Sequence, residues 1–155
     1  MLSLTAENVI INLEAQSRED VIRAIVDVMA ANGCVSQDYC GDVAAREEKY
    51  PTGLPTDGVR VAIPHGFSCS YVLKPAIGFA SLAKPVAFRN MADRDEELPV
   101  EIVFLLANTD ADEQVNDLSR LMGIFSEGEA LVRLREAKRA EDVVSIMGES
   151  LRTER

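Results

Sequence analysis

The sequence of 155 residues contains a single histidine, His65, and only three cysteines, Cys34, Cys40 and Cys69. None of the cysteines belongs to a Cys-x-x-Cys pair or to a Cys/His cluster, and an odd number of cysteines cannot all pair with one another. We therefore expect reduced thiols, as in a reducing cytoplasm, and neither a metal site nor another cofactor.

Basic residues are also few, since 16 Lys and Arg stand against 26 Asp and Glu, which gives a formal net charge of -10. A surface of this sign repels polyphosphate, so nucleic acid is not an expected partner. No apolar run approaches the ~20 residues of a membrane span, and residues 1–20 lack the basic region and apolar block of a signal peptide. The sequence predicts a cytoplasmic protein without direct membrane insertion.

The length and residue balance are typical of one globular domain over residues 1–155, with 47% hydrophobic and 27% charged residues. Helical periodicity predicts helices toward both ends of the chain, and short apolar runs predict strands in its middle. The helices are expected at 17–33, 37–49, 109–125, 130–137 and 140–151, and the strands at 8–13, 59–63, 76–82, 86–88 and 100–107. The expected fold is a three-layer α/β sandwich, in which a small mixed sheet carries helices on both faces.

Local signals sharpen this outline at three places. Ser17, with Asp20 three residues later, has the spacing of a capping box and marks the start of the first helix. Residues 50–58, YPTGLPTDG, predict a break in regular structure because they hold two prolines and two glycines. The helix after Asn108 is expected to bury an apolar face formed by Val115, Leu118, Leu121, Met122 and Phe125.

His65 stands in the stretch VAIPHGFSCS, two residues after the end of an apolar run. Pro64 favours an extended conformation at the residue before it, and Gly66 lets the backbone leave without a side chain that crowds the imidazole. Loops that follow strand ends hold functional side chains on a rigid scaffold. The sequence therefore predicts an imidazole presented at the surface on a loop tip.

An imidazole acts in proteins as a base, a metal ligand or a nucleophile. A second histidine for a metal site is missing, G-x-S-x-G is absent, and Ser68 and Ser70 lie too close to His65 in the sequence for an obvious triad. The phosphate-binding motifs G-x-x-x-x-G-K-S/T and G-x-G-x-x-G are absent as well. A nucleophilic histidine that carries a group transiently remains, and a small hydrolase with His65 as general base is the alternative from another class.

Five motifs follow one another in the chain: R-E at Arg46, P-T-G-L-P-T-D-G-V, V-A-I-P-H-G, P-A-I-G-F-A-S-L and P-V-E-I-V-F-L-L-A. In this order they resemble the enzyme IIA domains of the fructose/mannitol class (type 2) of the bacterial phosphoenolpyruvate-dependent sugar phosphotransferase system. The resemblance extends from Leu4 to about Leu151. Within that class, the longer Y-P-T-G-L-P-T segment looks most like the galactitol-type branch.

The resemblance implies a phosphotransferase component that serves the coupled uptake and phosphorylation of a sugar or polyol. His65 would accept a phosphoryl group from phosphorylated HPr, the histidine-containing carrier protein, and pass it to a cysteine of an enzyme IIB domain. Arg46, at the R-E position, is the candidate for stabilising the phosphoryl oxygens, because a guanidinium stays charged and offers forked donors. The candidates for orienting the phosphate or the imidazole are Thr52, Gly53, Thr56 and Gln114.

One position departs from the family. Many members carry a second histidine at the start of the helix after the F-L-L-A strand, whereas the matching region here reads D-A-D-E-Q-V, with Gln114 in that place. We therefore expect a mechanism with one histidine. The alternative function on the same fold is a regulatory module of the nitrogen-related type, in which phosphorylation of His65 is a signal and no sugar is taken up.

Overall fold

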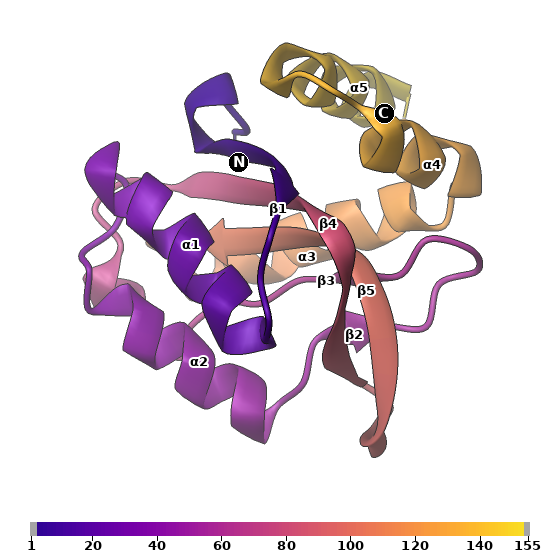
Figure 1. The fold of residues 1–155 in the computed structure, drawn as a ribbon. Helices are drawn as coiled ribbons and strands as arrows, with labels where there is room; N and C mark the ends of the chain where they lie inside the picture. The colour runs from indigo at the N-terminus through magenta and orange to yellow at the C-terminus, as the bar shows by residue number, and fades with distance from the viewer. Residues whose placement is uncertain (1–2, 154–155) are drawn as a thin grey trace.

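The computed structural model describes residues 3–153, so the ends of the predicted domain, 1–2 and 154–155, lie outside it. Within this range a mixed sheet carries two helices on one face and three on the other, which confirms the predicted three-layer α/β sandwich (Figure 1). The elements are η1 (Ala6–Asn8), β1 (Val9–Leu13), α1 (Arg18–Ala31), α2 (Tyr39–Lys49), β2 (Gly53–Leu54), β3 (Val61–Ala62), η2 (Cys69–Tyr71), β4 (Ala76–Asn90), β5 (Asp93–Ala107), α3 (Ala111–Phe125), α4 (Gly128–Glu136) and α5 (Ala140–Thr153).

Strands β4 and β5 are the two longest strands of the sheet. They pair antiparallel along most of their length and are joined by a tight turn at residues 91–92 (Figure 1). β1 pairs parallel with β4, and β3 pairs parallel with β5. The short strand β2 lies antiparallel to β3 and meets the far end of β4.

Alternate residues of β5 supply both layers of the core, as expected for a strand that is covered on its two faces. Ile102, Phe104 and Leu106 pack toward α3, α4 and α5, while Val103, Leu105 and Ala107 pack toward α1 and α2. On the first of these sides, the ring of Phe104 contacts Phe79 and Phe125, each at a centroid separation of 5.1 Å. His65 lies along this central strand, opposite Leu106.

The long hairpin of β4 and β5 was only partly predicted. Both strands have 15 residues, and residues 86–88, expected as a separate strand, continue β4 beyond an irregularity in pairing between Ser81 and Val86. Pro85 is tolerated at this irregularity because it has no N–H to donate to a regular ladder. The outer part of β5 reads DRDEE and is exposed, so it lacks the apolar pattern by which strands are recognised.

Three further expectations are wrong in detail. Helix α2 begins at residue 39 instead of 37, because the hydroxyl of Ser36 accepts a hydrogen bond from the N–H of Asp38 in a turn before the helix. The segment 50–58, predicted without regular structure, contributes the two residues of β2. On α3, Val115 is 65% exposed and Met122 is 42% exposed, and Met122 borders a cavity instead of the sheet.

Candidate functional site

His65 follows β3 and still lies along the sheet, where it forms an isolated parallel bridge with Leu106 of β5. The backbone N–H of Leu106 donates to the carbonyl oxygen of Pro64 at 3.1 Å. As a result, His65 is only 8% exposed, and the prediction of an exposed loop tip is wrong. The apolar run that predicts this strand ends at Ile63, whereas the backbone stays paired with β5 through Pro64 and His65.

The imidazole of His65 is held by one hydrogen bond, since its Nδ1 lies 2.9 Å from the carbonyl oxygen of Ile63. A carbonyl oxygen only accepts, so the neutral ring carries its proton on Nδ1 and keeps a lone pair on Nε2. Burial lowers the pKa of His65 to about 4, an effect that this hydrogen bond opposes and the charge of Arg46 reinforces. At neutral pH the ring is therefore uncharged, and its Nε2 carries an unprotonated lone pair.

The chain that leaves His65 is fastened to α2 by Tyr39. The phenolic oxygen of Tyr39 accepts a hydrogen bond from the N–H of Gly66 at 3.1 Å and donates one to the carbonyl oxygen of Leu106 at 2.6 Å. Burial raises the pKa of Tyr39 to about 12, so the hydroxyl keeps its proton. A Cβ at Gly66 would lie 2.6 Å from Cε1 of Tyr39, and close packing therefore requires glycine here.

A cavity of about 540 Å³ adjoins His65 and is bounded by the end of α2, the β4–β5 turn and α3. Three cationic side chains line it, those of Arg46, Lys49 and Arg94, and among the described lining residues there is no Asp or Glu. Its apolar lining includes Tyr50, Met91, Leu118 and Met122. In a protein with a net charge of -10, positive charge is thus gathered beside a neutral imidazole, which suits an anionic group.

Arg46 is held by aromatic rings and not by acids. Its Cζ lies 5.3 Å from the ring centroid of Tyr50 and 5.9 Å from that of Phe67. Its guanidinium makes no hydrogen bond or ion pair with the residues that the structure describes, whereas Arg89 pairs with Glu48 at 3.0 Å. Stacking restrains the guanidinium while its N–H donors stay available to an anion.

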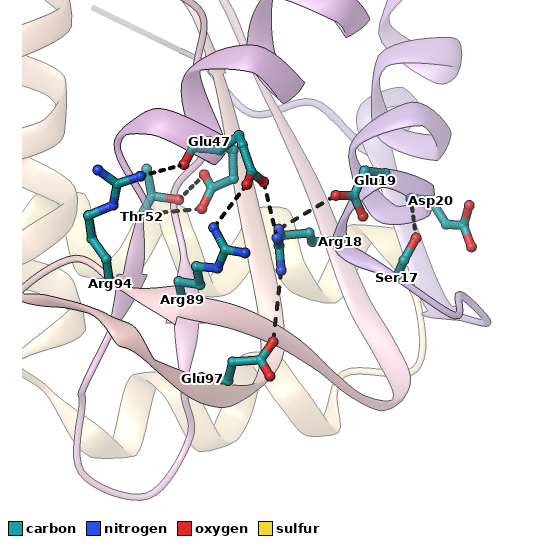
Figure 2. A network of polar contacts seen from close by, with 10 residues as sticks. Ser17, Arg18, Glu19, Asp20, Glu47, Thr52, Arg89, Arg94 and Glu97 are labelled. Atoms are coloured by element: carbon teal, nitrogen blue, oxygen red, sulfur yellow. Dashed lines mark hydrogen bonds and ion pairs between the residues drawn. The ribbon is translucent and has the colours of Figure 1, made fainter.

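Thr52 also borders the cavity, but its polar groups are engaged elsewhere. Its hydroxyl accepts from the N–H of Ile63 at 3.2 Å and donates to the carboxylate of Glu47 at 2.7 Å (Figure 2). The second oxygen of Glu47 accepts from the N–H of Thr52 at 2.8 Å. Burial raises the pKa of Glu47, against the effect of these two hydrogen bonds. Glu47, beside Arg46 in the R-E motif, was not among the residues predicted from the sequence.

The other three candidates are not brought into the cavity lining. Gly53 lies in β2, where a Cβ would stand 2.5 Å from the carbonyl oxygen of Arg89. The hydroxyl of Thr56 donates to the carbonyl oxygen of Val59 at 2.5 Å, within its own loop. Gln114 lies on α3, one turn before the part that lines the cavity, and its Oε1 is buried without a hydrogen-bond partner among the described residues.

The contribution of the β4–β5 turn to the site was also missed. Met91 and Arg94 reach the cavity only because the long hairpin folds back beside the end of α2, where Arg94 donates to the carbonyl oxygen of Glu48 at 3.2 Å. Over residues 3–153 we find no group of His, Cys, Asp and Glu side chains arranged to hold a metal ion. Over the same residues, none of the helices has the length and apolar character needed to cross a bilayer.

Fold and site together define a small α/β domain whose single histidine, neutral and buried, borders a cavity lined by three cationic side chains. Residues 2–150 match the family described as "Phosphoenolpyruvate-dependent sugar phosphotransferase system, EIIA 2". The chain belongs to this family of type 2 enzyme IIA domains and is a phosphotransferase component.

Among curated proteins, the mannitol-specific phosphotransferase enzyme IIA component of Bacillus subtilis is 31% identical over 151 residues, which cover 96% of this chain and 99% of that protein. Longer relatives match as well, such as the fructose-specific EIIABC component of Bacillus subtilis, of which the chain spans 22% at 28% identity. These names confirm the predicted class. They refer to mannitol and fructose, so they do not support the galactitol-type branch.

Solved structures of the class share the fold. The complex of enzyme IIA and phosphorylated enzyme IIB for mannitol from Escherichia coli matches with a TM-score of 0.79 at 23% identity, over 96% of this chain and 99% of that one. The nitrogen regulatory protein IIA-Ntr from Neisseria meningitidis matches with a TM-score of 0.76 at 27% identity, over 93% and 95% of the two chains.

Proposed function

We propose that this protein is a phosphocarrier in which His65 accepts a phosphoryl group from phosphorylated HPr and passes it to a cysteine of an enzyme IIB domain. The transfer would serve the coupled uptake and phosphorylation of a sugar or polyol. The observation that carries the proposal is a neutral imidazole, with Nε2 free, beside a cavity lined by three cations.

In the first transfer, the Nε2 lone pair attacks the phosphorus of the donor's phosphohistidine. A new N–P bond forms while the donor's N–P bond breaks, and the electron pair returns to the donor's ring. In the second transfer, the cysteine thiolate of enzyme IIB attacks the same phosphorus, an S–P bond forms, and the electron pair returns to Nε2. Because the Nδ1–H tautomer already leaves Nε2 unprotonated, His65 needs no general base.

Charge stabilisation is the main demand of phosphoryl transfer, and the cations of the cavity can meet it. Arg46 has free forked donors for two phosphoryl oxygens, while Lys49 and Arg94 add charge around them. The apolar side chains near them support docking of protein partners, since Tyr50 and Phe67 are both exposed and pack edge to face.

The identity of the transported sugar or polyol is a separate part of the proposal. The mannitol and fructose relatives favour a hexitol or hexose, and galactitol rests on the P-T-G-L-P-T segment alone. That segment also has a structural role, because it forms β2 and carries the contact between Thr52 and Glu47. Galactitol therefore stays a prediction.

A regulatory role is the second candidate, favoured by the 27% identity to IIA-Ntr of Neisseria meningitidis. In that case phosphorylated His65 would be a signal, and the phosphoryl group would not move on to a IIB cysteine. The two functions share the first transfer and differ in the second.

The experiment is incubation with phosphoenolpyruvate, enzyme I and HPr, followed by intact mass measurement. We expect one acid-labile phosphoryl group on the wild type, none on His65→Ala, and none when HPr is omitted. Addition of enzyme IIB should then discharge the protein, and a IIB variant with its cysteine replaced by serine should not. Full phosphorylation of His65→Ala would overturn the proposal, and retention of the phosphoryl group with every IIB tested would favour the regulatory role.

A further inference from the structure

We propose that Glu47 and Thr52 are positioning residues for His65, which they orient and hold in the Nδ1–H tautomer through the backbone of Ile63. The inference rests on the proposed function, because it concerns the reactivity of His65 as a phosphoryl acceptor. Neither Glu47 nor Thr52 is assigned a contact with the phosphoryl group.

A continuous set of hydrogen bonds joins these residues. The Thr52 hydroxyl donates to Glu47 Oε1 at 2.7 Å and accepts from the N–H of Ile63 at 3.2 Å (Figure 2 shows the Glu47 end). The carbonyl oxygen of Ile63 in turn accepts from Nδ1 of His65 at 2.9 Å. All four residues are buried, so water does not compete with these bonds.

The carboxylate of Glu47 determines the orientation of the Thr52 hydroxyl in this set. An ionised carboxylate only accepts, so the proton of the Thr52 hydroxyl is committed to Glu47 and a lone pair of Oγ1 faces the N–H of Ile63. The bond from the Thr52 N–H to the other carboxylate oxygen, at 2.8 Å, prevents Glu47 from rotating away.

Ile63 connects the Thr52 hydroxyl to the imidazole through its own N–H and carbonyl groups. Its N–H is fixed by the Thr52 hydroxyl and lies 3.4 Å from the Thr52 carbonyl oxygen, and its side chain is buried in the core. The following proline restricts Ile63 to an extended conformation. With both sides of Ile63 restrained, its carbonyl oxygen is aimed at Nδ1 of His65, and this leaves Nε2 for the reaction.

The burial of Glu47 needs an explanation of this kind, because a buried carboxylate is costly unless its environment compensates it. Among the described residues no cation forms an ion pair with Glu47, although the charges of Arg18 and Arg46 act against the rise of its pKa. Glu47 is also not among the side chains that line the cavity. Both of its oxygens instead accept from Thr52. The geometry is that of a carboxylate which orients a reactive ring, with a hydroxyl and a backbone segment in between.

The single histidine makes the test direct, since ring nitrogen NMR of ¹⁵N-histidine-labelled protein reports one imidazole. The variants are Thr52→Val, which removes the hydroxyl at equal size, and Glu47→Gln, which introduces a competing donor. Thr52→Ser keeps the hydroxyl. Thr56→Val is the matched control, because the Thr56 hydroxyl bonds only within its own loop.

We expect the wild type, Thr52→Ser and Thr56→Val to show the Nδ1–H tautomer at neutral pH. Thr52→Val and Glu47→Gln should show a mixture of both neutral tautomers. Their kcat/KM for transfer from phosphorylated HPr should fall ~10-fold or more, because the attacking nitrogen is no longer held in place.

Wild-type tautomer and rate in both Thr52→Val and Glu47→Gln would overturn the inference, as would a lower rate with an unchanged tautomer. If Thr52→Val does not fold, the tautomer and the transfer rate of Glu47→Gln, compared with those of Thr52→Ser, test the inference. A wild type that is not phosphorylated by HPr would instead refute the proposed function, and the tautomer spectra would still decide whether Glu47 and Thr52 orient the ring.

Discussion

Arg46 in the last turn of α2 and His65 after β3 line the same cavity, and the charge of Arg46 contributes to the low pKa of His65. Because neighbouring positions on a helix point in different directions, Arg46 and Glu47 of the R-E pair have different surroundings. Arg46 lies at the cavity with its donors free, while Glu47 is buried against Thr52. In the proposed mechanism, Arg46 would thus serve charge stabilisation and Glu47 would serve orientation of the ring.

Replacement of Arg46 should affect transfer far more than folding. Arg46→Ala should lower kcat/KM for phosphoryl transfer ~100-fold, as expected for loss of a donor to developing charge. Arg46→Lys should recover only part of this, because an ammonium lacks the forked donors. Arg133→Ala, an exposed arginine on α4, is the control. Equal transfer rates for the wild type and Arg46→Ala would leave Arg46 as an ordinary residue at a helix end.

The low pKa of His65 predicts a loss of stability in acid. The folded pKa is about 4 and the ordinary value is 6.5, so between these values the unfolded chain binds more protons. The contribution of His65 is fully present above pH 6.5 and declines as the pH falls toward 4. We expect the wild type to lose ~3 kcal/mol more than His65→Ala between pH 7 and pH 4.

Urea unfolding at several pH values measures this difference. The comparison with His65→Ala is needed because the raised pKa of Glu47 contributes a pH dependence of the opposite sign in both proteins. Parallel curves of unfolding free energy against pH for the two proteins would contradict the assignment of a low pKa to His65.

Local signals were enough for the layers of the fold, and they singled out His65, whose phosphorylation stays a prediction. Ser17 caps α1 as predicted, since its hydroxyl accepts from the N–H of Asp20 at 3.2 Å (Figure 2). The nearly continuous apolar run that ends at Ala107 is the strand covered on both faces, and this run can be recognised without knowledge of the partners. These features depend on neighbours in the sequence, which is why sequence patterns reveal them.

The rest of the site depends on tertiary contacts. Arg94 reaches the cavity through the register of a long hairpin whose outer part is charged and exposed, and no apolar pattern reports that register. The bond between Glu47 and Thr52 requires the turn after α2 to fold back on the helix. A glutamate within a charged helix end resembles a solvated residue in the sequence, so its burial could not be inferred.

Gly66 should resist substitution because of space, since a Cβ there would collide with Tyr39 and Asp42. Gly66→Ala should lower the unfolding free energy by ~1–3 kcal/mol and slow transfer, because the backbone next to His65 has to shift. Gly41→Ala is the matched control, as nothing lies within 4 Å of a Cβ there. It should be neutral or more stable by up to ~1 kcal/mol, since alanine favours a helix. Equal effects of the two substitutions would contradict close packing at Gly66.

Gln114 on α3 has a buried Oε1 that lacks a hydrogen-bond partner among the described residues. Gln114→Met keeps the shape and removes this polar group, so we expect the unfolding free energy to rise by ~1 kcal/mol. A buried polar group that lowers stability beside the His65 cavity suggests a role in function. We therefore expect phosphoryl transfer by Gln114→Met to be severalfold slower. Asn116→Ala, at an exposed position of α3, should change stability by less than ~0.5 kcal/mol and leave transfer unchanged. A Gln114→Met protein that is more stable and transfers at the wild-type rate would show that Gln114 takes no part in the reaction.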